Sequence, residues 1–214
     1  MIAGETLKTP QNVEVLLFPL EYMNISQPEL MPSGWSHAGI LAIDFLGWNA
    51  NGRVYDCPYY APCSCRCVAS TESANRIWQS LEPVLLADGT TSYVTWVQAH
   101  DESPHAVGTV LSQGQLLGHT GTAGIGTGDH VHFNFARGTY ANWVQKPPDS
   151  MWELRNSIHI YDACYVNDTV IIDGENYNWR TYNQPTPPPL PPYSKGDPMI
   201  TMMQINNLKR KEVE

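Results

Sequence analysis

The chain of 214 residues has little charge and no long hydrophobic run. Asp, Glu, Lys and Arg make up only 15% of it, and 21 acidic residues against 12 basic ones give a formal net charge of -9. No basic stripe offsets this charge, so the chain lacks the attraction for phosphate on which most nucleic-acid binding depends, and we expect no nucleic-acid partner. Because nowhere do about 18 apolar residues run together, we expect no membrane span.

Two further features are missing, a signal peptide and an even number of cysteines. Residues 1–23, MIAGETLKTPQNVEVLLFPLEYM, have no charged segment followed by an uninterrupted apolar core, so we expect no export signal. An odd number of cysteines in such a chain implies no complete disulfide framework, and at least one thiol should stay free. The cysteines are Cys57, Cys63, Cys65, Cys67 and Cys164.

What the chain does have is turn residues and alternating apolar segments. It contains 16 glycines and 17 prolines, which favour strands and turns over long helices. Residues 72–83 fit either a helical turn or a strand, and their spacing does not decide between the two. The sequence predicts a mainly β protein, with strands at 13–18, 39–45, 66–70, 92–100, 130–135, 158–166 and 168–174.

The pattern changes after about Pro148. Residues 158–182 indicate a compact hairpin unit, residues 183–193 a proline-rich linker in extended polyproline II conformation, and residues 200–214 a short helix that needs a partner to form. The sequence therefore predicts a domain of residues 1–150, a β-hairpin appendage of residues 151–183, and a linker with a C-terminal tail of residues 184–214.

Two histidines stand one residue apart in the segment GTGDHVHFNFARG, residues 126–138. In an extended strand His130 and His132 point to the same face, which makes this segment a candidate site. Upstream, His37 and Asp44 flank an apolar segment, and a carboxylate inside a run suited to a buried strand needs a partner. His100 ends another apolar run. Since a catalytic zinc takes three protein ligands and keeps one position open, these residues together indicate a metal site.

Each of these residues also has a purely structural interpretation. A single strand histidine is often a satisfied structural residue, and Asp44 could accept hydrogen bonds from turn amides. Cys63, Cys65 and Cys67 share one strand face, where they would pack as small apolar residues or, with Cys57, chelate a structural zinc. The remaining histidines are expected to be surface or packing residues: His105, His119 and His159.

Three segments together resemble the lysostaphin-like (LytM-type) zinc metallopeptidases. They read SHAGILAID at 36–44, WVQAHDE at 96–102, and GQLLGHTGTAGIGTGDHVHFNF at 114–135. The last is similar to the family's G-Q-x-x-G turn, glycine-rich loop and H-x-H-F strand in unbroken succession. The segments YMNISQ at 22–27 and VYDCPYYAPCSCRCVAS at 54–70 resemble phage-encoded members. The resemblance covers about residues 15–138.

The resemblance implies a fold, an ion and roles for these residues. The fold would be an antiparallel β-sheet groove, with Zn²⁺ bound by His37, Asp44 and His132. His100 and His130 would serve the bound water and the developing oxyanion. One departure concerns Asp44. Six residues separate it from His37 where the family commonly has three, so the extra residues must loop or bulge out for both side chains to reach one ion.

The resulting hypothesis is a zinc endopeptidase that hydrolyses peptide bonds of bacterial peptidoglycan for a phage, in lysis or in cell-wall penetration by the virion. We expect it in the virion tail, or in the host cytoplasm before release, with peptidoglycan peptides and other tail proteins, through the C-terminal segment, as partners. The main rival is a noncatalytic wall-binding or tail structural module that keeps the fold. A third hypothesis, a cysteine-zinc interaction module, predicts metal bound by thiols.

Overall fold

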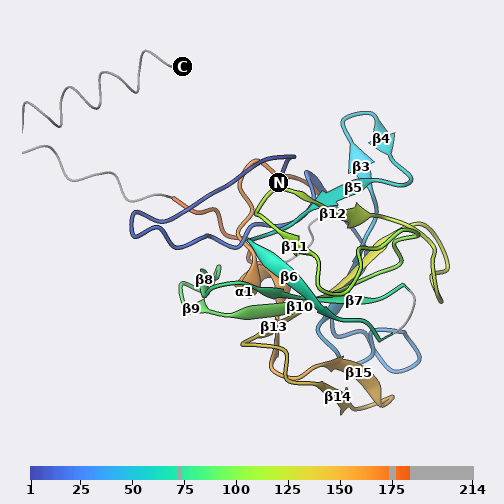
Figure 1. The fold of residues 1–214 in the computed structure, drawn as a ribbon. Helices are drawn as coiled ribbons and strands as arrows, with labels where there is room; N and C mark the ends of the chain where they lie inside the picture. Colours follow the sequence, from blue (N-terminus) through green and yellow to red (C-terminus); the bar gives the residue numbers. More distant parts are fainter. Residues whose placement is uncertain (72–73, 174–176, 184–214) are drawn as a thin grey trace, which may run out of the picture. The chain divides into compact units, whose positions relative to one another are not determined.

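A computed structural model describes residues 1–71, 74–173 and 177–183 (Figure 1). Its elements in chain order are β1 (Tyr22–Gln27), β2 (Ala42–Phe45), β3 (Trp48–Asn49), β4 (Gly52–Arg53), β5 (Pro58–Tyr60), β6 (Cys65–Ala69), β7 (Arg76–Ser80), β8 (Val84–Leu85), β9 (Thr91–Ser92), β10 (Val94–Ala99), β11 (Val110–Leu111), β12 (Leu116–His119), β13 (Val131–Arg137), β14 (Trp143–Lys146), β15 (Met151–Leu154), β16 (Ser157–Ile158), α1 (Ile160–Ala163) and β17 (Val170–Asp173).

One nine-stranded sheet dominates the described part of the chain. Its order is β11-β6-β7-β10-β13-β2-β1-β17, and β16 pairs with β13 beside this path. All its pairs are antiparallel except β1 with β17, which run parallel. The prediction of a mainly β, antiparallel protein is therefore confirmed, with one parallel pair at the sheet edge.

Both faces of the central strands are buried, which explains why β10 has no exposed residue. Trp96 and Phe135 belong to the large core on one face, which also contains Trp78 and Phe133. The next residues along the chain, Val97 and Ala136, pack in a smaller cluster on the other face. Because side chains alternate along a strand, His132 points to this second face, beside Val97 on the neighbouring strand.

The hairpin β14–β15 covers part of the second face, and Figure 1 shows it below β7, β10 and β13. Leu154 is buried in the cluster with Val97, and Trp143 packs against the same cluster. Two polar residues hold the hairpin in place. Asn134 of β13 accepts a hydrogen bond from the backbone N–H of Leu154 at 2.7 Å, and the buried Glu153 accepts one from the N–H of Leu41 at 2.9 Å.

Most predicted strands are present, and residues 72–83 contribute strand β7 rather than a helical turn. Residues 13–18 form no ladder. Val15 makes an isolated bridge to Leu85, and Leu17 makes one to Tyr165. The buried residues of this segment thus lie between two neighbouring segments and pair continuously with neither.

The strands of the segment predicted as a hairpin appendage pair with several different parts of the chain. The hairpin found here, β14–β15, has one strand on each side of residue 150, while β16 and β17 pair with β13 and β1. Residues 160–163 form the short helix α1 instead of a strand. Met1–Tyr182 form one compact unit, and the predicted linker and tail of residues 184–214 lie outside the described residues.

Among the described residues, no helix has the length and apolar character needed to cross a membrane.

Candidate metal centre

Strand register brings Asp44 and His132 together. The two residues lie directly opposite each other on the antiparallel strands β2 and β13, and His132 lies opposite Ala99 on its other side. Opposite residues in an antiparallel pair point to the same face with their Cβ atoms about 4.5–5.5 Å apart. Here His132 Nδ1 is 2.9 Å from Asp44 Oδ1.

A turn at residues 37–41 supplies the third side chain. The N–H of Ile40 donates to the carbonyl of His37, and the N–H of Gly39 donates to that of Met31. Gly39 has a φ of +68°, and a Cβ there would lie 2.0 Å from the carbonyl oxygen of Pro147, so only glycine fits. This turn absorbs the extra residues between His37 and Asp44, so the unusual spacing closes without a break in β2.

His37, Asp44 and His132 form the one metal-competent cluster found among the described residues. His37 Nε2 lies 3.2 Å from His132 Nδ1 and 3.3 Å from Asp44 Oδ1. Four ligands at about 2.0–2.1 Å from a tetrahedral zinc lie roughly 3.3 Å from one another, so the three atoms have the spacing that such an ion requires. Two imidazole nitrogens facing each other beside a carboxylate also need a proton or a cation between them. The residues therefore fit Zn²⁺.

Hydrogen bonds orient the groups for this purpose. His37 Nδ1 lies 3.2 Å from the carbonyl oxygen of Pro28, which can only accept, so Nδ1 carries a proton and Nε2 is the nitrogen that faces Asp44 and His132. Burial opposes ionisation of Asp44, but hydrogen bonds with His132 and His37 outweigh it, and the pKa of Asp44 lies well below its ordinary value. A carboxylate that stays ionised is an available ligand.

His130 and His100 lie beside this cluster as a second pair. Their ring centroids are 4.4 Å apart, and His130 Nε2 is 3.6 Å from Asp44 Oδ2. His130 Nδ1 donates to the carbonyl of Gly128 at 2.6 Å, and His100 Nδ1 donates to that of Ala123 at 2.8 Å. In both rings Nε2 is therefore the nitrogen left to face the site. Burial lowers the pKa of His100, which favours its neutral form near neutral pH.

The glycine-rich loop after β12 holds this pair, and it packs directly on His100. His100 has a φ of +76°, and its carbonyl accepts a hydrogen bond from Ala123 at 3.2 Å. A Cβ on Gly121 would lie 2.2 Å from the same carbonyl oxygen, so a side chain there would push the loop away. Gly121 and His130 also exchange backbone hydrogen bonds of 3.0 Å, which close the loop.

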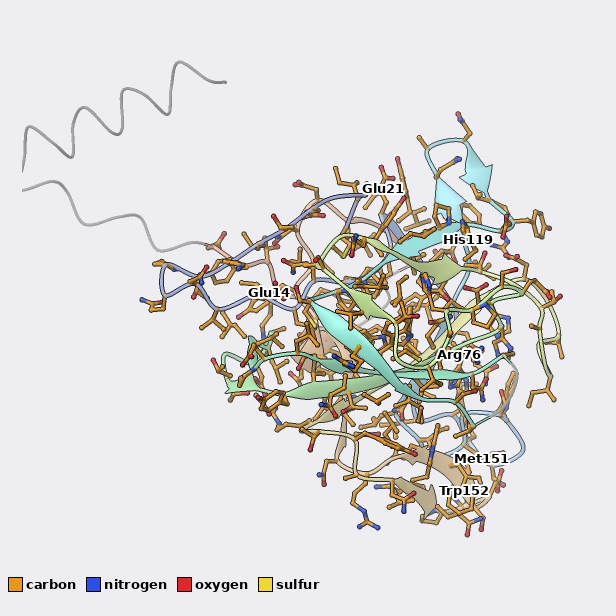
Figure 2. All side chains as sticks on the ribbon, in the orientation of Figure 1. Glu14, Glu21, Arg76, His119, Met151 and Trp152 are labelled. Atoms are coloured by element: carbon orange, nitrogen blue, oxygen red, sulfur yellow. The ribbon has the colours of Figure 1, made fainter. Side chains whose placement is uncertain are left out.

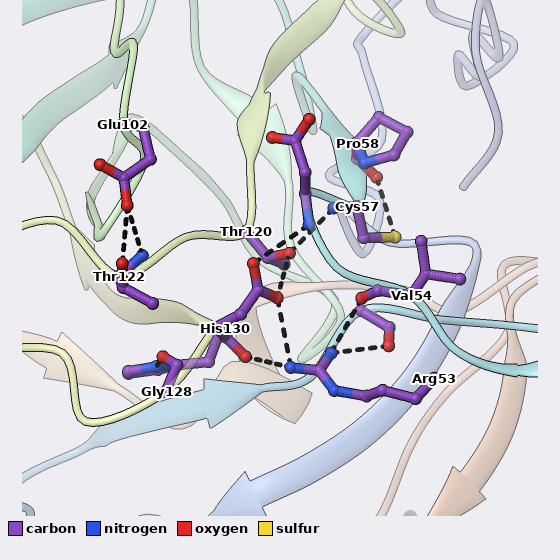
Figure 3. Close-up of polar contacts among 12 residues, drawn as sticks. Arg53, Val54, Cys57, Pro58, Glu102, Thr120, Thr122, Gly128 and His130 are labelled. Atoms are coloured by element: carbon purple, nitrogen blue, oxygen red, sulfur yellow. Dashed lines mark hydrogen bonds and ion pairs between the residues drawn. The ribbon is translucent and has the colours of Figure 1, made fainter.

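Side chains on both flanks fasten this loop (Figure 3). Asp129, next to His130, accepts hydrogen bonds from Thr120 Oγ1 at 2.8 Å and the N–H of Asp56 at 3.0 Å, and its carboxylate is 3.2 Å from Arg53. Arg53 also donates to the carbonyl oxygen of Asp129. On the other flank Glu102 accepts hydrogen bonds from the hydroxyl and N–H of Thr122 at 2.8 and 3.0 Å.

The cluster opens into a groove with two compartments. A pocket of about 270 Å³ contains all five residues, which are His37, Asp44, His100, His130 and His132. A larger pocket of about 700 Å³ is lined by Trp143, Trp152 and Val97 and shares His132 and Ile125 with the first. Ile125, 89% exposed at the tip of the glycine-rich loop, stands at the boundary between them.

The structure brings all five predicted site residues together and leaves the other histidines elsewhere. His105 Nε2 contacts the carbonyl of Leu116, His119 lies on β12, and His159 pairs with Glu29 at 2.6 Å. All five cysteines are buried and free, and they form no metal-competent group among the described residues, which leaves the cysteine-zinc hypothesis without support.

Sequence reasoning missed the residues that hold and surround the site. Arg53 lies on the short strand β4, Asp129 and Glu102 lie in two separate loops, and Trp143 and Trp152 come from a hairpin beyond the motif. Only the position of Asp129 directly before the H-x-H pair offered a signal, because a carboxylate there is well placed to anchor the glycine-rich loop.

In sequence, the chain is similar to Morphogenesis protein 1 of Bacillus phage B103. The two are 41% identical over 179 residues, which cover 82% of this chain and 47% of the phage protein. The chain thus spans about half the length of this curated relative. No family model matches the chain.

Solved structures similar to this one include the catalytic domain of lysostaphin from Staphylococcus simulans, with a TM-score of 0.41, 18% identity, and coverage of 56% of this chain and 84% of that one. A zinc-containing peptidase from Vibrio cholerae gives a TM-score of 0.41 at 13% identity over 62% of this chain and 43% of that one. A prophage-encoded M23 protein from Enterococcus faecalis gives 0.37 at 15% identity over 54% and 81%. The chain is thus a sequence relative of a phage morphogenesis protein, and the solved structures that it resembles are lysostaphin-type peptidases.

Proposed function

We propose that this chain is a zinc-dependent endopeptidase of the lysostaphin-like type that hydrolyses peptide bonds in bacterial peptidoglycan. The observation that carries the proposal is the convergence of His37, Asp44 and His132 at ligand spacing, with two further imidazoles beside them in an open groove. A purely structural cluster would not need this arrangement, because two buried polar groups and a half-buried one are costly to bring together without an ion.

In this proposal His37 Nε2, Asp44 Oδ1 and His132 Nδ1 hold the ion. Zn²⁺ bound there supplies an activated water nucleophile and polarises the carbonyl of the peptide bond. The pKa of Asp44 lies below its ordinary value, so its carboxylate is ionised near neutral pH and available as a ligand. The carbonyl of Pro28 fixes the tautomer in which His37 presents a lone pair.

In this proposal His130 and His100 act as the general acid–base groups. Because each donates its Nδ1–H to a backbone carbonyl, each Nε2 faces the site. One Nε2 would accept the proton that the attacking water loses and pass it to the leaving amine, and the other ring, protonated at Nε2, would donate a hydrogen bond to the developing oxyanion. Burial lowers the pKa of His100, which favours its role as the proton acceptor. The anchored glycine-rich loop keeps both rings at their positions, which limits the entropy lost on reaching the transition state.

The phage setting rests on the sequence relative. Its name, Morphogenesis protein 1, favours a role in the virion, so we propose that the chain is carried in the particle and opens the cell wall during penetration. The C-terminal residues 184–214 would contact other tail proteins. Because the chain spans about half of that relative, this assignment concerns only the part present here.

The test is digestion of purified cell walls from several bacteria, Bacillus included, by the zinc-loaded protein. We expect new free amino groups at a defined peptide bond, identified by mass spectrometry of the released fragments. New reducing sugars without new amino groups, or bound walls without any cleavage, would overturn the proposal, and the second result would favour a noncatalytic wall-binding module.

Two variants make this test specific. Asp44→Asn keeps the shape of the side chain but removes the charge that the ion requires, so it should lose both zinc and cleavage. His105→Ala is the matched control, since His105 lies outside both compartments, and it should keep both.

A further inference from the structure

The larger compartment of the groove has walls unlike those of the compartment that contains the histidines and Asp44. Its volume is about 700 Å³, within the range of about 300–1,000 Å³ typical of small-molecule sites. Apart from His132, the described residues that line it offer indoles, aliphatic side chains, amides and a threonine hydroxyl, and none of them carries a carboxylate, ammonium or guanidinium group. A ligand for this compartment should therefore be uncharged, with apolar faces and hydrogen-bonding edges.

The indoles come from one face of the hairpin β14–β15. Trp143 lies opposite Leu154, and Trp152 lies opposite Gln145, so Trp143 and Trp152 are diagonal neighbours on the same face. Trp143 packs against the buried cluster, whereas Trp152 is 57% exposed and forms an outer wall of the compartment (Figure 2). A large aromatic side chain left this exposed at a pocket marks a binding surface.

The hairpin is rigidly attached, so the compartment is formed before any ligand arrives. Glu153 is buried, accepts a hydrogen bond from the N–H of Leu41, and pairs with Lys146 at 3.0 Å. Asn134 fixes the N–H of Leu154 from the other side. These hydrogen bonds hold Trp152 next to the histidines and the carboxylate of the smaller compartment. Because the hairpin is already ordered, less conformational entropy is lost when a ligand binds.

We propose that this aromatic compartment binds an N-acetylated amino-sugar unit of the glycan strand next to the peptide that is cleaved. A sugar ring presents C–H groups on its faces, which stack on indoles, and hydroxyl and acetamido groups at its edges, which the amides of Asn75 and Asn142 can bind. The wall peptide, by contrast, carries free carboxylates, and the described lining of this compartment offers no cation to pair with them. The assignment of the sugar rests on the proposed function.

The first experiment measures binding without catalysis. Metal-free protein is titrated with a chitin oligosaccharide, an oligomer of N-acetylglucosamine, while tryptophan fluorescence and heat are recorded. We expect saturable binding that Trp152→Ala weakens by about tenfold or more, as expected when an aromatic anchor is truncated, and that Trp152→Phe largely restores. Trp35→Ala is the matched control, because Trp35 is 54% exposed but lines neither compartment.

The second experiment compares two substrates for the zinc-loaded protein, a cross-linked wall peptide with its disaccharide attached and the same peptide with the sugars removed. We expect wild-type protein to prefer the first by about tenfold in kcat/KM, and Trp152→Ala to lose this preference by slowing only the sugar-bearing substrate.

The outcomes separate the two proposals. Equal cleavage of both substrates without saccharide binding would overturn the sugar site and leave the endopeptidase intact. An equal loss on both substrates in Trp152→Ala would assign the compartment to a peptide side chain instead. If neither substrate is cleaved, the proposed function fails, and the saccharide titration still decides whether the compartment binds sugar.

Discussion

Two regions of this protein look alike in sequence and differ completely in structure. His130 and His132 alternate at the start of β13, His130 directly before the strand, and Cys63, Cys65 and Cys67 alternate from just before β6 into it. Either set could hold a metal. The histidines face a groove beside a carboxylate, whereas the three cysteines are completely buried in the main hydrophobic core.

The difference shows what can and cannot be inferred from residues that alternate along a strand. A period of two shows that side chains share one face of a strand, but the neighbouring strands decide what that face meets. At β13 the register with β2 places Asp44 opposite His132. At β6 the same geometry directs the thiols into the core, where burial raises the pKa of Cys63 and Cys65 well above the ordinary value and keeps them protonated.

The largest expected effect is on the histidine side of this comparison. His132→Ala removes one of three ligands, so we expect the protein to lose stoichiometric zinc and wall cleavage to fall by more than about 10³-fold, since the ion contributes several kcal/mol to the transition state. Metal analysis by mass spectrometry and a cleavage assay on the same preparation check both parts. If stoichiometric zinc survives in the variant, the ligand assignment is wrong.

The next effect separates proton transfer from metal binding. His100→Ala and His130→Ala should each slow wall cleavage by about 10²- to 10⁴-fold, in the range of general acid–base groups, while zinc content and folding stay nearly unchanged. The double variant should be much less impaired than the product of the two single effects, because the rings act as a pair. Full cleavage by zinc-loaded His130→Ala would refute the mechanism.

A smaller effect is expected at the anchor of the glycine-rich loop. Arg53→Ala removes the partner of Asp129 and loosens the segment that carries His130, so we expect kcat to fall by about tenfold with zinc retained, similar to losses at other supporting residues. Asp129→Asn keeps the hydrogen bond from Thr120 and should lose less. A variant that raises KM alone would instead mean that Arg53 acts on substrate binding.

The smallest effect on function is expected at the cysteines. Cys65→Ser places a hydroxyl in the apolar core, so the free energy of unfolding should fall by about 1–3 kcal/mol, the cost of an unpaired buried polar group. Zinc content should not change. Denaturant unfolding and metal analysis test this prediction. A folded variant that loses its zinc would mean that the cysteines, and not the histidine cluster, bind the metal.

The sequence predicted the strands and the candidate site residues more completely than it predicted the strand pairing and the contacts that hold these residues in place. Residues 92–100 and 130–135 are strands as expected, because apolar residues occupy both faces of β10 and most of β13. Residues 158–182 were expected to form a hairpin unit, but strands β16 and β17 pair with β13 and β1 outside this segment, and local alternation carries no information about such partners.

The site shows the same limit. The H-x-H spacing and the polar residue inside an apolar run made His132 and Asp44 candidates, since both anomalies are local, and the structure brings the two side chains together. The turn that closes the gap to His37 depends on Gly39 packing against Pro147, more than a hundred residues away, and so could not be foreseen. The same is true of the wall that Trp152 forms beside the site, which depends on the hydrogen bonds that Asn134 and Glu153 accept from the N–H groups of Leu154 and Leu41.

The central claim is that the chain binds its metal through His37, Asp44 and His132 and not through its cysteines. X-ray absorption spectroscopy at the zinc edge of the loaded protein tests it most directly. The account predicts only nitrogen and oxygen ligands at about 2.0–2.2 Å, with the multiple scattering of two imidazoles, and loss of the signal in Asp44→Asn. A shell of sulfur at about 2.3 Å, or an unchanged spectrum in Asp44→Asn, would contradict it.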